Sequence, residues 1–471
     1  MSEAIDRPTQ EVVEGVQDAG GLGGHPKGLT TLFFTELWER FSYYGMRAIL
    51  VLYMVAPAAQ GGLGFDTKHA ASIYGTYTMS VYLTALPGGL VADKWLGARL
   101  AVLLGGIVIA CGHFTMVFQS TTFLYAGMAL IAIGTGLLKP NISTMVGGLY
   151  RGNDPRRDSG FSLFYMGINI GAVLAPLVCG YLAQGEGFKR FLASQGFNPA
   201  ASWHWGFGAA GVGMVLGLLV FVLQRGRLRQ AEQRVEEQGG VVPGGEAAES
   251  AQQRLTSGDW KRIGVIFVLF FFTILFWAAY EQKGASLNLF ARDLVRTEVF
   301  GFAFPSSWLQ SLTPFYVIIL APVFSVMWVR MGDRQPSSPA KFAYGMLFIG
   351  LAYLLFMVPA AWMTADGRVS PLWLVGLYFL EVVGEMCLSP VGLSTVTKLS
   401  PAKLVGIMMG VWFLAASLGS KLAGYLSGFF VANDPATLVR LYGGIALGLL
   451  VATGVLVLLI PTLRRMMGHV K

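Results

Sequence analysis

Charged side chains share one face of the segment FFTELWERFSYYGMRAIL, which contains Glu36, Glu39, Arg40 and Arg47. At about 100° per residue, these four and Tyr43 fall within an arc of about 100° on a helix, and the opposite face is apolar. Acids and bases at this spacing can pair with one another, exchange protons or hold a ligand that carries both charges. The alternative interpretation is a purely structural ladder from Glu36 to Arg40, which would suit a helix in water better than one among apolar residues.

Further ionisable residues interrupt apolar segments later in the chain: Lys139, Glu281, Lys283, Glu381, Glu385 and Lys421. An ionised side chain at the centre of a membrane-spanning helix costs about 2.5–3.5 kcal/mol. Five acids and five bases at this depth must therefore face one another or a water-filled cavity. We expect Lys139 and Glu385 to line that cavity, and we leave the roles of Glu381, Lys283 and Lys421 open.

The composition places these segments in a membrane. Hydrophobic residues make up 54% of the 471 residues, charged residues make up 13%, and the mean hydropathy is +0.58. A soluble domain carries roughly 25% charged residues. These values exclude a disordered protein and a small disulfide scaffold, and they predict an all-α integral membrane protein.

Twelve apolar segments are long enough to cross a bilayer, which takes about 20 helical residues. The predicted spans are roughly 30–57, 66–92, 98–118, 121–148, 158–184, 203–225, 259–292, 309–331, 339–360, 371–399, 404–431 and 438–461. A polar segment separates the first six from the last six, as in transporters built from two repeated halves. We therefore expect a tail at 1–28, a six-helix bundle at 29–225, a linker at 226–258, a second six-helix bundle at 259–463 and a tail at 464–471.

The basic residues indicate the orientation of the chain. Most of the 34 lysines and arginines lie in the tails and in the loops that share a side with them. Cytoplasmic loops carry the excess of Lys and Arg, so both termini are expected in the cytoplasm. The same asymmetry accounts for the net charge of +8 without a nucleic-acid partner.

A cavity lined by both charges suits a small zwitterion. Arg47 and Lys139 in the first bundle would hold a carboxylate, and Glu385 in the second would hold an ammonium. A ligand that bridges the bundles would couple its own binding to their closure. A carboxylate that exchanges partners with the ligand is also a natural proton site. The residues therefore predict a proton-coupled carrier of a small zwitterionic solute.

The segment from Glu36 to Arg47 resembles the ExxER-F-x-Y-Y-G signature of the proton-dependent oligopeptide transporters, a branch of the major facilitator superfamily. Four further stretches are similar to motifs of this family: GGLVAD at 88–93, FYMGINIG at 164–171, EQ at 281–282 and EMCLSPVGLS at 385–394. Lys139 and Trp412 match its span-four lysine and span-eleven tryptophan. The resemblance covers nearly the whole chain and implies the major facilitator fold. It also implies proton-driven import of di- and tripeptides across a bacterial inner membrane.

By this resemblance, Arg47 and Lys139 would contact the peptide carboxylate, and Asn169 and Glu385 would contact the amino end. Aromatic residues would shape the side-chain pockets: Tyr43, Tyr44, Tyr82, Trp277 and Trp412. A proton-linked network would comprise Glu36, Glu39, Arg40 and Lys139, and Glu281 would be a proton site that pairs with Arg47 across the bundles. Apart from the proton as coupling ion, no cofactor or metal is expected. A single chain among membrane lipids would suffice as a monomer.

The chain departs from the family pattern at three places. Thr313 stands before Pro314, where the family commonly has asparagine, so this candidate substrate contact lacks the two donors of an amide. Gly75 occupies the position of a span-two histidine in animal members, so proton coupling cannot use that group. The linker at 226–258 is too polar to supply the two extra helices that many bacterial members insert.

Three other functions were weighed against a peptide carrier. Another facilitator substrate, such as a drug, an amino acid or nitrate, remains open because plant relatives share ExxER. A membrane enzyme would be expected to show clustered Asp, His or Glu in loops outside the bilayer, and the longest loop has no such cluster. A channel is disfavoured because alternating acid–base pairs indicate gates that open in turn.

Overall fold

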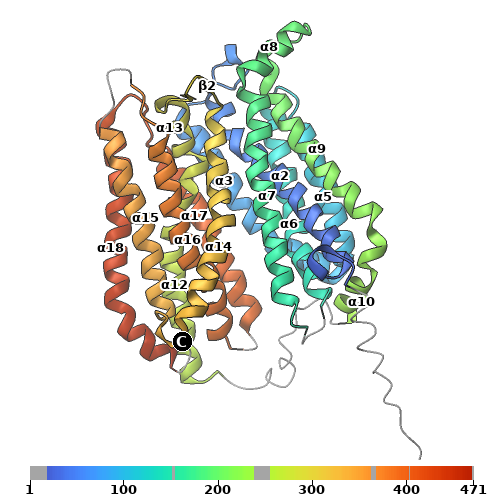
Figure 1. Cartoon of the computed structure of the whole chain (residues 1–471), viewed down its shortest axis with the longest axis vertical. Helices are drawn as coiled ribbons and strands as arrows, with labels where there is room; N and C mark the ends of the chain where they lie inside the picture. The colour runs from blue at the N-terminus through green and yellow to red at the C-terminus, as the bar shows by residue number, and fades with distance from the viewer. Residues whose placement is uncertain (1–18, 151–153, 238–254, 362–366, 402–403, 469–471) are drawn as a thin grey trace, which may run out of the picture.

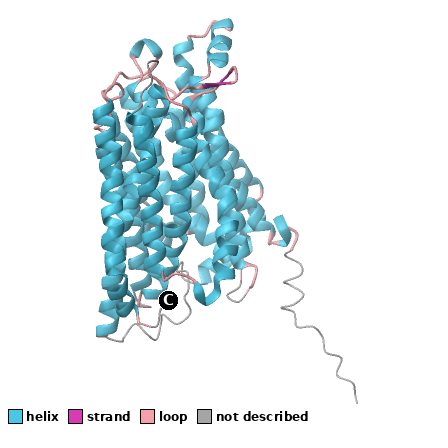
Figure 2. Cartoon of the chain, turned by 60° about the vertical axis from the view of Figure 1, so that its left-hand side comes forward, coloured by secondary structure: helices cyan, strands magenta, loops and turns pink. Residues whose placement is uncertain are grey.

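The computed structural model describes residues 19–150, 154–237, 255–361, 367–401 and 404–468, and nearly all of their regular structure is helical (Figures 1 and 2). Most of the predicted tail at 1–28, the middle of the predicted linker and the end of the predicted tail at 464–471 lie outside these residues. The helices run along the long axis of the molecule, and a short two-stranded ribbon lies at one end (Figure 2).

The first half of the chain contains helices up to the start of the predicted linker. In order these are η1 (Leu22–Gly24), α2 (Lys27–Val55), η2 (Ala58–Gln60), α3 (Thr67–Leu83), α4 (Ala85–Val91), η3 (Ala92–Leu96), α5 (Ala98–Thr115), α6 (Thr121–Gly148), α7 (Arg157–Gln184), α8 (Glu186–Ser194), η4 (Pro199–Ala201), α9 (Ser202–Leu223), η5 (Arg225–Leu228) and α10 (Arg229–Glu237). The start of the predicted linker is therefore helical.

The second half resumes with α12. Its elements are α12 (Ser257–Tyr280), η6 (Glu281–Gly284), α13 (Ser286–Leu294), β1 (Glu298–Val299), β2 (Phe302–Ala303), η7 (Ser306–Ser311), α14 (Leu312–Met331), η8 (Gly332–Arg334), α15 (Ser338–Ala361), α16 (Leu372–Leu399), α17 (Val405–Ser427) and α18 (Pro435–Met467).

Ten helical stretches of the described residues are long and apolar enough to cross a membrane. Two predicted spans fall outside this set for local reasons. The helix α2 has 29 residues but carries Glu36, Glu39, Arg40 and Arg47 along its length, and α3 has only 17 residues before α4 continues it. The remaining predicted spans lie within a few residues of observed helices.

The two halves of the chain lie on opposite sides of the molecule. In Figure 1, α2 and α5 to α10 lie on the right, α12 to α18 lie on the left, and α3 lies near the middle. Across the boundary, α3 packs against α17, and α7 packs against α14 and η7. The residue boundaries of the two bundles stay a prediction.

The predicted span at 259–292 corresponds to the stretch Ser257–Leu294, but its helix is interrupted. Helix α12 ends at Tyr280, the turn η6 follows, and Ala285 leaves the helical region with φ −127° and ψ −96°. The side chain of Gln282 compensates for the break, since it donates to the carbonyls of Ala278 and Ala423 and accepts from two hydroxyls, those of Ser286 and Ser427. An interrupted spanning helix is stable only where such partners are present.

Two glycines allow α3 and α17 to touch. A Cβ atom at Gly75 would lie 2.8 Å from the Cα of Gly424, and a Cβ atom at Gly424 would lie 2.6 Å from the carbonyl oxygen of Ala71. Small residues are needed where membrane helices approach this closely. The position that carries histidine in animal members therefore has a packing role in this chain.

We expect Gly424→Ala to destabilise the protein by about 1–3 kcal/mol, because the new methyl group has no space at the contact between α3 and α17. Thermal unfolding in detergent measures the effect. The control is Gly454→Ala on α18, where a Cβ would meet no atom within 4 Å and alanine favours the helix. A Gly424→Ala protein as stable as wild type would show that the two helices are not held this closely.

Candidate functional site

A polar cavity of about 330 Å³ lies between the two halves. Its walls come from α2, α3, α6 and α7 on one side and from α12, η6, η7, α14, α16 and α17 on the other. All but two of the predicted site residues line it: Glu36, Arg40, Tyr44, Arg47, Tyr82, Lys139, Asn169, Trp277, Glu281, Thr313, Glu385 and Trp412. The remaining two, Glu39 and Tyr43, are buried in α2 behind this surface.

The guanidinium of Arg40 is held by two carboxylates of its own helix. It forms a bidentate ion pair with Glu39, in which Nε donates to Oε2 and Nη2 donates to Oε1 at 2.7 Å. Its Nε also lies 3.2 Å from Oε1 of Glu36. The second oxygen of Glu36 is buried and has no hydrogen-bond partner among the described residues. This part of the network therefore has an acceptor left for a proton or a cation.

Lys139 reaches the cavity from α6, next to the proline at position 140. Its Nζ lies 4.7 Å from the centre of the Tyr82 ring, a cation–π distance. From α6, its positive charge interacts electrostatically with the carboxylates of Glu36 and Glu39 on α2. Lys139 thus adds a cation beside the α2 network without an ion pair of its own among the described residues.

Arg47 connects the two halves directly. Its Nη2 donates to Oε2 of Glu281 on η6, and its Nε donates to the Tyr74 hydroxyl on α3 at 2.5 Å. The residue at 284 has to be glycine, because a Cβ there would lie 1.6 Å from the Tyr74 oxygen. The break in the seventh span therefore brings a carboxylate to α2 and also leaves room for the tyrosine.

Glu385 on α16 is the acidic group on the opposite wall. Its Oε2 accepts a hydrogen bond from the Tyr280 hydroxyl, and its side chain faces the cavity. On α7, the amide Nδ2 of Asn169 donates to the Tyr165 carbonyl at 2.9 Å, so its oxygen is the atom suited to a ligand ammonium. The cavity therefore has cations on the wall of α2 and α6 and acceptors on the walls of α7 and α16.

Aromatic and polar side chains complete the walls. Trp412 packs edge-on against Phe342, and Gly392 leaves room for its indole, since a Cβ there would lie 2.2 Å from it. Thr313 has a buried hydroxyl without a hydrogen-bond partner among the described residues, so this predicted contact can still offer a donor.

Several residues of the site carry no clear signal in the sequence. Tyr165, Tyr280 and Gln310 line the cavity, and Tyr74 supports Arg47 from behind. Tyr165 lies within the stretch FYMGINIG, and Tyr280 directly precedes Glu281. Their proximity to these motifs is the one sequence feature that could identify them as site residues. With 13% aromatic residues, the chain offers too many tyrosines for residue type alone to select them.

Polar contacts between the halves gather around the cavity and toward the end that carries α8, α13 and η7 (Figure 1). On this side, Asn288 and Gln310 both donate to the Ala48 carbonyl, and Trp308 donates to the Leu177 carbonyl. Nearer the middle, Lys421 donates to the Thr76 hydroxyl at 2.6 Å. Lys421 therefore contacts α3 from α17 and does not line the cavity.

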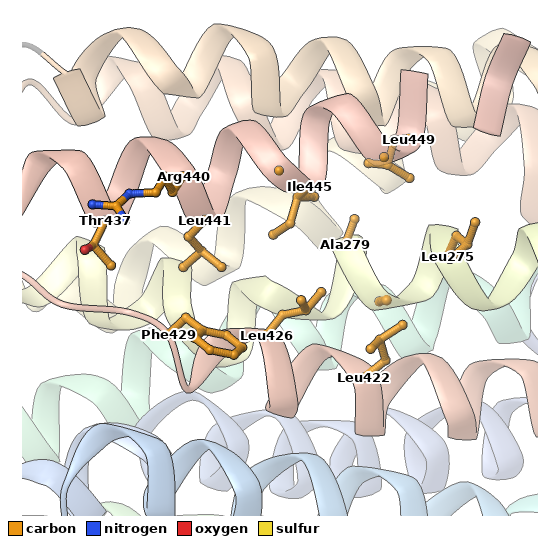
Figure 3. Close-up of a pocket in the computed structure, with 13 residues that line it drawn as sticks. Leu275, Ala279, Leu422, Leu426, Phe429, Thr437, Arg440, Leu441, Ile445 and Leu449 are labelled. Atoms are coloured by element: carbon orange, nitrogen blue, oxygen red, sulfur yellow. The ribbon is translucent and has the colours of Figure 1, made fainter. Parts of the chain in front are cut away.

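A second cavity, of about 560 Å³, lies between α12, α17 and α18 (Figure 3). Its lining is apolar except for Thr437 and Arg440 near one end. It holds none of the paired charges described above, so it does not suit a small zwitterion. Within the described residues, no group of three or more His, Cys, Asp or Glu could hold a metal ion.

Comparisons with known proteins agree on one family. A sequence profile of the POT family matches residues 99–237 and 227–441. The peptide transporter YePEPT of Yersinia enterocolitica is 37% identical, over 95% of this chain and 96% of that protein. The di-/tripeptide transporter of Lactococcus lactis subsp. cremoris is 34% identical, over 95% of this chain and 98% of that protein.

A solved structure is similar over the whole fold. The crystal structure of a mutant of peptide transporter POT in complex with alafosfalin matches with a TM-score of 0.84 at 38% identity. The match covers 98% of this chain and 100% of that one. The predicted all-α membrane architecture of the major facilitator superfamily is thereby confirmed.

We expect the buried pair of Arg47 and Glu281 to show strong coupling in a double-mutant cycle. Arg47→Met should destabilise the protein by about 3–5 kcal/mol, because it leaves a buried carboxylate without its cation, and Glu281→Gln added to it should recover part of the loss. Thermal unfolding of the four proteins in detergent gives the coupling. The control cycle uses the exposed pair Arg99 and Glu232, for which we expect less than about 1 kcal/mol. Equal coupling in both cycles would contradict a special role of the buried pair.

Proposed function

The chain belongs to the POT family of proton-dependent oligopeptide transporters, and on this premise we propose that it imports di- and tripeptides together with protons. The relatives named above are a peptide transporter and a di-/tripeptide transporter. The proposed process is transport by alternating access, in which one cavity opens to each side of the membrane in turn. It requires no metal or organic cofactor and no chemical change of the peptide.

The observation that carries this proposal is the separation of charge across the cavity. Arg47 and Lys139 lie on the first half, and Glu385 lies on the second. A peptide has a carboxylate at one end and an ammonium at the other, so it complements both walls at once. A peptide that bridges the halves would stabilise the closed arrangement, and binding energy would drive the conformational change. Tyr44, Trp277 and Trp412 would contact the peptide side chains.

Proton coupling would act through the pair of Arg47 and Glu281. Protonation of Glu281 removes the charge that attracts Arg47, so the contact between the halves weakens and Arg47 becomes available to the peptide carboxylate. The loss of the Glu281 charge would also affect the other charges on the α2 side of the cavity, which are Glu36, Glu39, Arg40 and Lys139. Protonation of Glu281 and binding of the peptide carboxylate to Arg47 would thus favour each other, and this positive coupling would link peptide transport to the proton.

The contacts between the halves also suggest the state of the transporter. Their concentration toward the end with α8, α13 and η7 is the arrangement expected of a carrier closed on that side and open toward the linker. We assign the linker side to the cytoplasm from the distribution of basic residues, which gives an inward-facing state. The protein would work as a monomer in the bacterial inner membrane, with both termini in the cytoplasm.

Uptake into liposomes tests the proposed function. Purified protein should accumulate labelled dialanine inside liposomes when an inward proton gradient and an inside-negative potential are imposed. Accumulation of dialanine above its external concentration should disappear when the gradient is collapsed with a protonophore. Folded protein without gradient-dependent uptake would refute peptide–proton symport.

Glu281→Gln separates proton coupling from peptide binding. The amide cannot take up a proton, so we expect gradient-driven accumulation to disappear while exchange of dialanine at equal concentrations continues. Both assays use the same liposomes, and thermal unfolding confirms that the variant is folded. Loss of both activities would mean that Glu281 serves the structure and does not couple the proton.

A further inference from the structure

A second group of charges lies in the C-terminal half, and neither the peptide nor the proton pathway described above uses all of it. Glu381 and Glu385 lie one turn apart on α16, and Lys283 lies opposite them on η6. The positive charge that acts on both carboxylates is that of Lys283. Two acids therefore share one base in this cluster.

The two acids differ in their access to the cavity. Glu385 lines the cavity and is 8% exposed, whereas Glu381 does not line it and is 0% exposed. Both carboxylate oxygens of Glu381 are buried and have no hydrogen-bond partner within 3.5 Å among the described residues, although the Tyr353 hydroxyl acts on this carboxylate from a longer distance. A substrate can therefore reach Glu385 but not Glu381. A buried carboxylate without a partner is strongly unfavourable, so Glu381 requires a cation or a proton from within the protein.

Lys283 is placed to serve either acid. It lines the cavity, and its Nζ lies 3.3 Å from the centre of the Tyr280 ring. Among the described residues, no carboxylate oxygen lies within 4.0 Å of this Nζ. The same tyrosine donates its hydroxyl to Glu385. The ammonium group thus lies over an aromatic ring and forms no close ion pair with either carboxylate, and its flexible four-carbon stem leaves it free to move.

We propose that Lys283 is an internal substitute for the substrate ammonium: its charge offsets that of Glu385 while the cavity is empty, and it shifts toward Glu381 when a peptide binds. Glu381 is then a positioning residue: it never touches the peptide but provides the site to which the displaced lysine withdraws. The exchange keeps one cation on each carboxylate while the peptide is bound. This inference rests on the proposed peptide transport and explains how the carrier would recognise the free amino end.

The groups around Glu381 include one cation, the mobile ammonium of Lys283, that could pair with its carboxylate. The charged or titratable groups that act on it are Lys283 on η6, Glu385 on its own helix and three tyrosines, Tyr280 on α12, Tyr353 on α15 and Tyr378 on α16. The Tyr353 hydroxyl already donates to the Ala279 carbonyl at 2.8 Å. Lys283 is the one cation among these groups.

The test compares recognition of the amino end in wild type and Glu381→Gln. Inhibition of labelled dialanine exchange is measured with unlabelled dialanine and with N-acetyl-dialanine, which lacks the ammonium. In Glu381→Gln the lysine has lost its second carboxylate and stays at Glu385. We expect the inhibition constant of dialanine to rise at least about tenfold, while that of N-acetyl-dialanine stays the same or falls.

Lys283→Met provides the rescue and a second, independent variant. Added to Glu381→Gln, it removes the competing cation, so dialanine should again inhibit within about threefold of wild type. As a single change it should increase the discrimination against N-acetyl-dialanine, because Glu385 then has no internal cation when the ligand lacks an ammonium. The matched control is Lys421→Met, which removes a lysine that contacts α3 and does not line the cavity, and it should leave the ratio of the two inhibition constants unchanged.

The outcomes separate this inference from the proposed function. If wild type exchanges dialanine but Glu381→Gln keeps the wild-type ratio, Glu381 is a neutral packing group and the inference is overturned. It is also overturned if Lys283→Met fails to rescue folded Glu381→Gln protein. If wild type neither exchanges nor accumulates dialanine, peptide transport itself is refuted.

Discussion

The ion pair between Arg47 and Glu281 is the interaction on which the rest of the site depends. It joins α2 of the first half to η6 of the second, and both partners are buried. Two buried charges are tolerated only while they are paired, so each half needs the other in this arrangement. The pair also explains the interruption of the seventh span, because the turn η6 carries Glu281 and its glycine at 284 leaves space for the tyrosine that supports Arg47.

The charges around the cavity form two groups of different character. On the first half, bases and acids are close to balanced, and Arg40 is already satisfied by Glu39 and Glu36. On the second half, two acids share one base. The empty cavity therefore lacks one positive charge beside α16, and a proton or a substrate ammonium can supply it. This imbalance attracts the amino end of a ligand toward α16, while Lys139 and Arg47 attract its carboxylate end.

Much of this arrangement could be predicted from the sequence because charge is rare in a membrane chain. The helical period of α2 predicts that Glu36, Arg40 and Arg47 share a face, and all three line the cavity. The meeting of Lys139 and Glu385 in one cavity could be predicted because ionised side chains at membrane depth must face one another or water. The roles of the individual residues stay predictions.

Other features could not be predicted, for physical reasons. The apolar pattern continues through SLNLF after Glu281, so hydropathy gives no sign that Ala285 leaves the helix. The break is stabilised by hydrogen bonds from Gln282 to α17, which only the tertiary structure provides. The close contact of Gly75 with Gly424 is likewise a property of two helices, and a single glycine in a span does not reveal its partner.

The central claim is that the ion pair of Arg47 and Glu281 holds the halves together at the end with α8 and η7. Pulsed electron resonance can measure this with spin labels at Ala193→Cys in α8 and Phe300→Cys in the β1–β2 turn, both exposed, after Cys111→Ser has removed the exposed native thiol. Wild type should give one short distance, and Glu281→Gln should add a population at longer distance. Identical distance distributions in the two proteins would contradict the account.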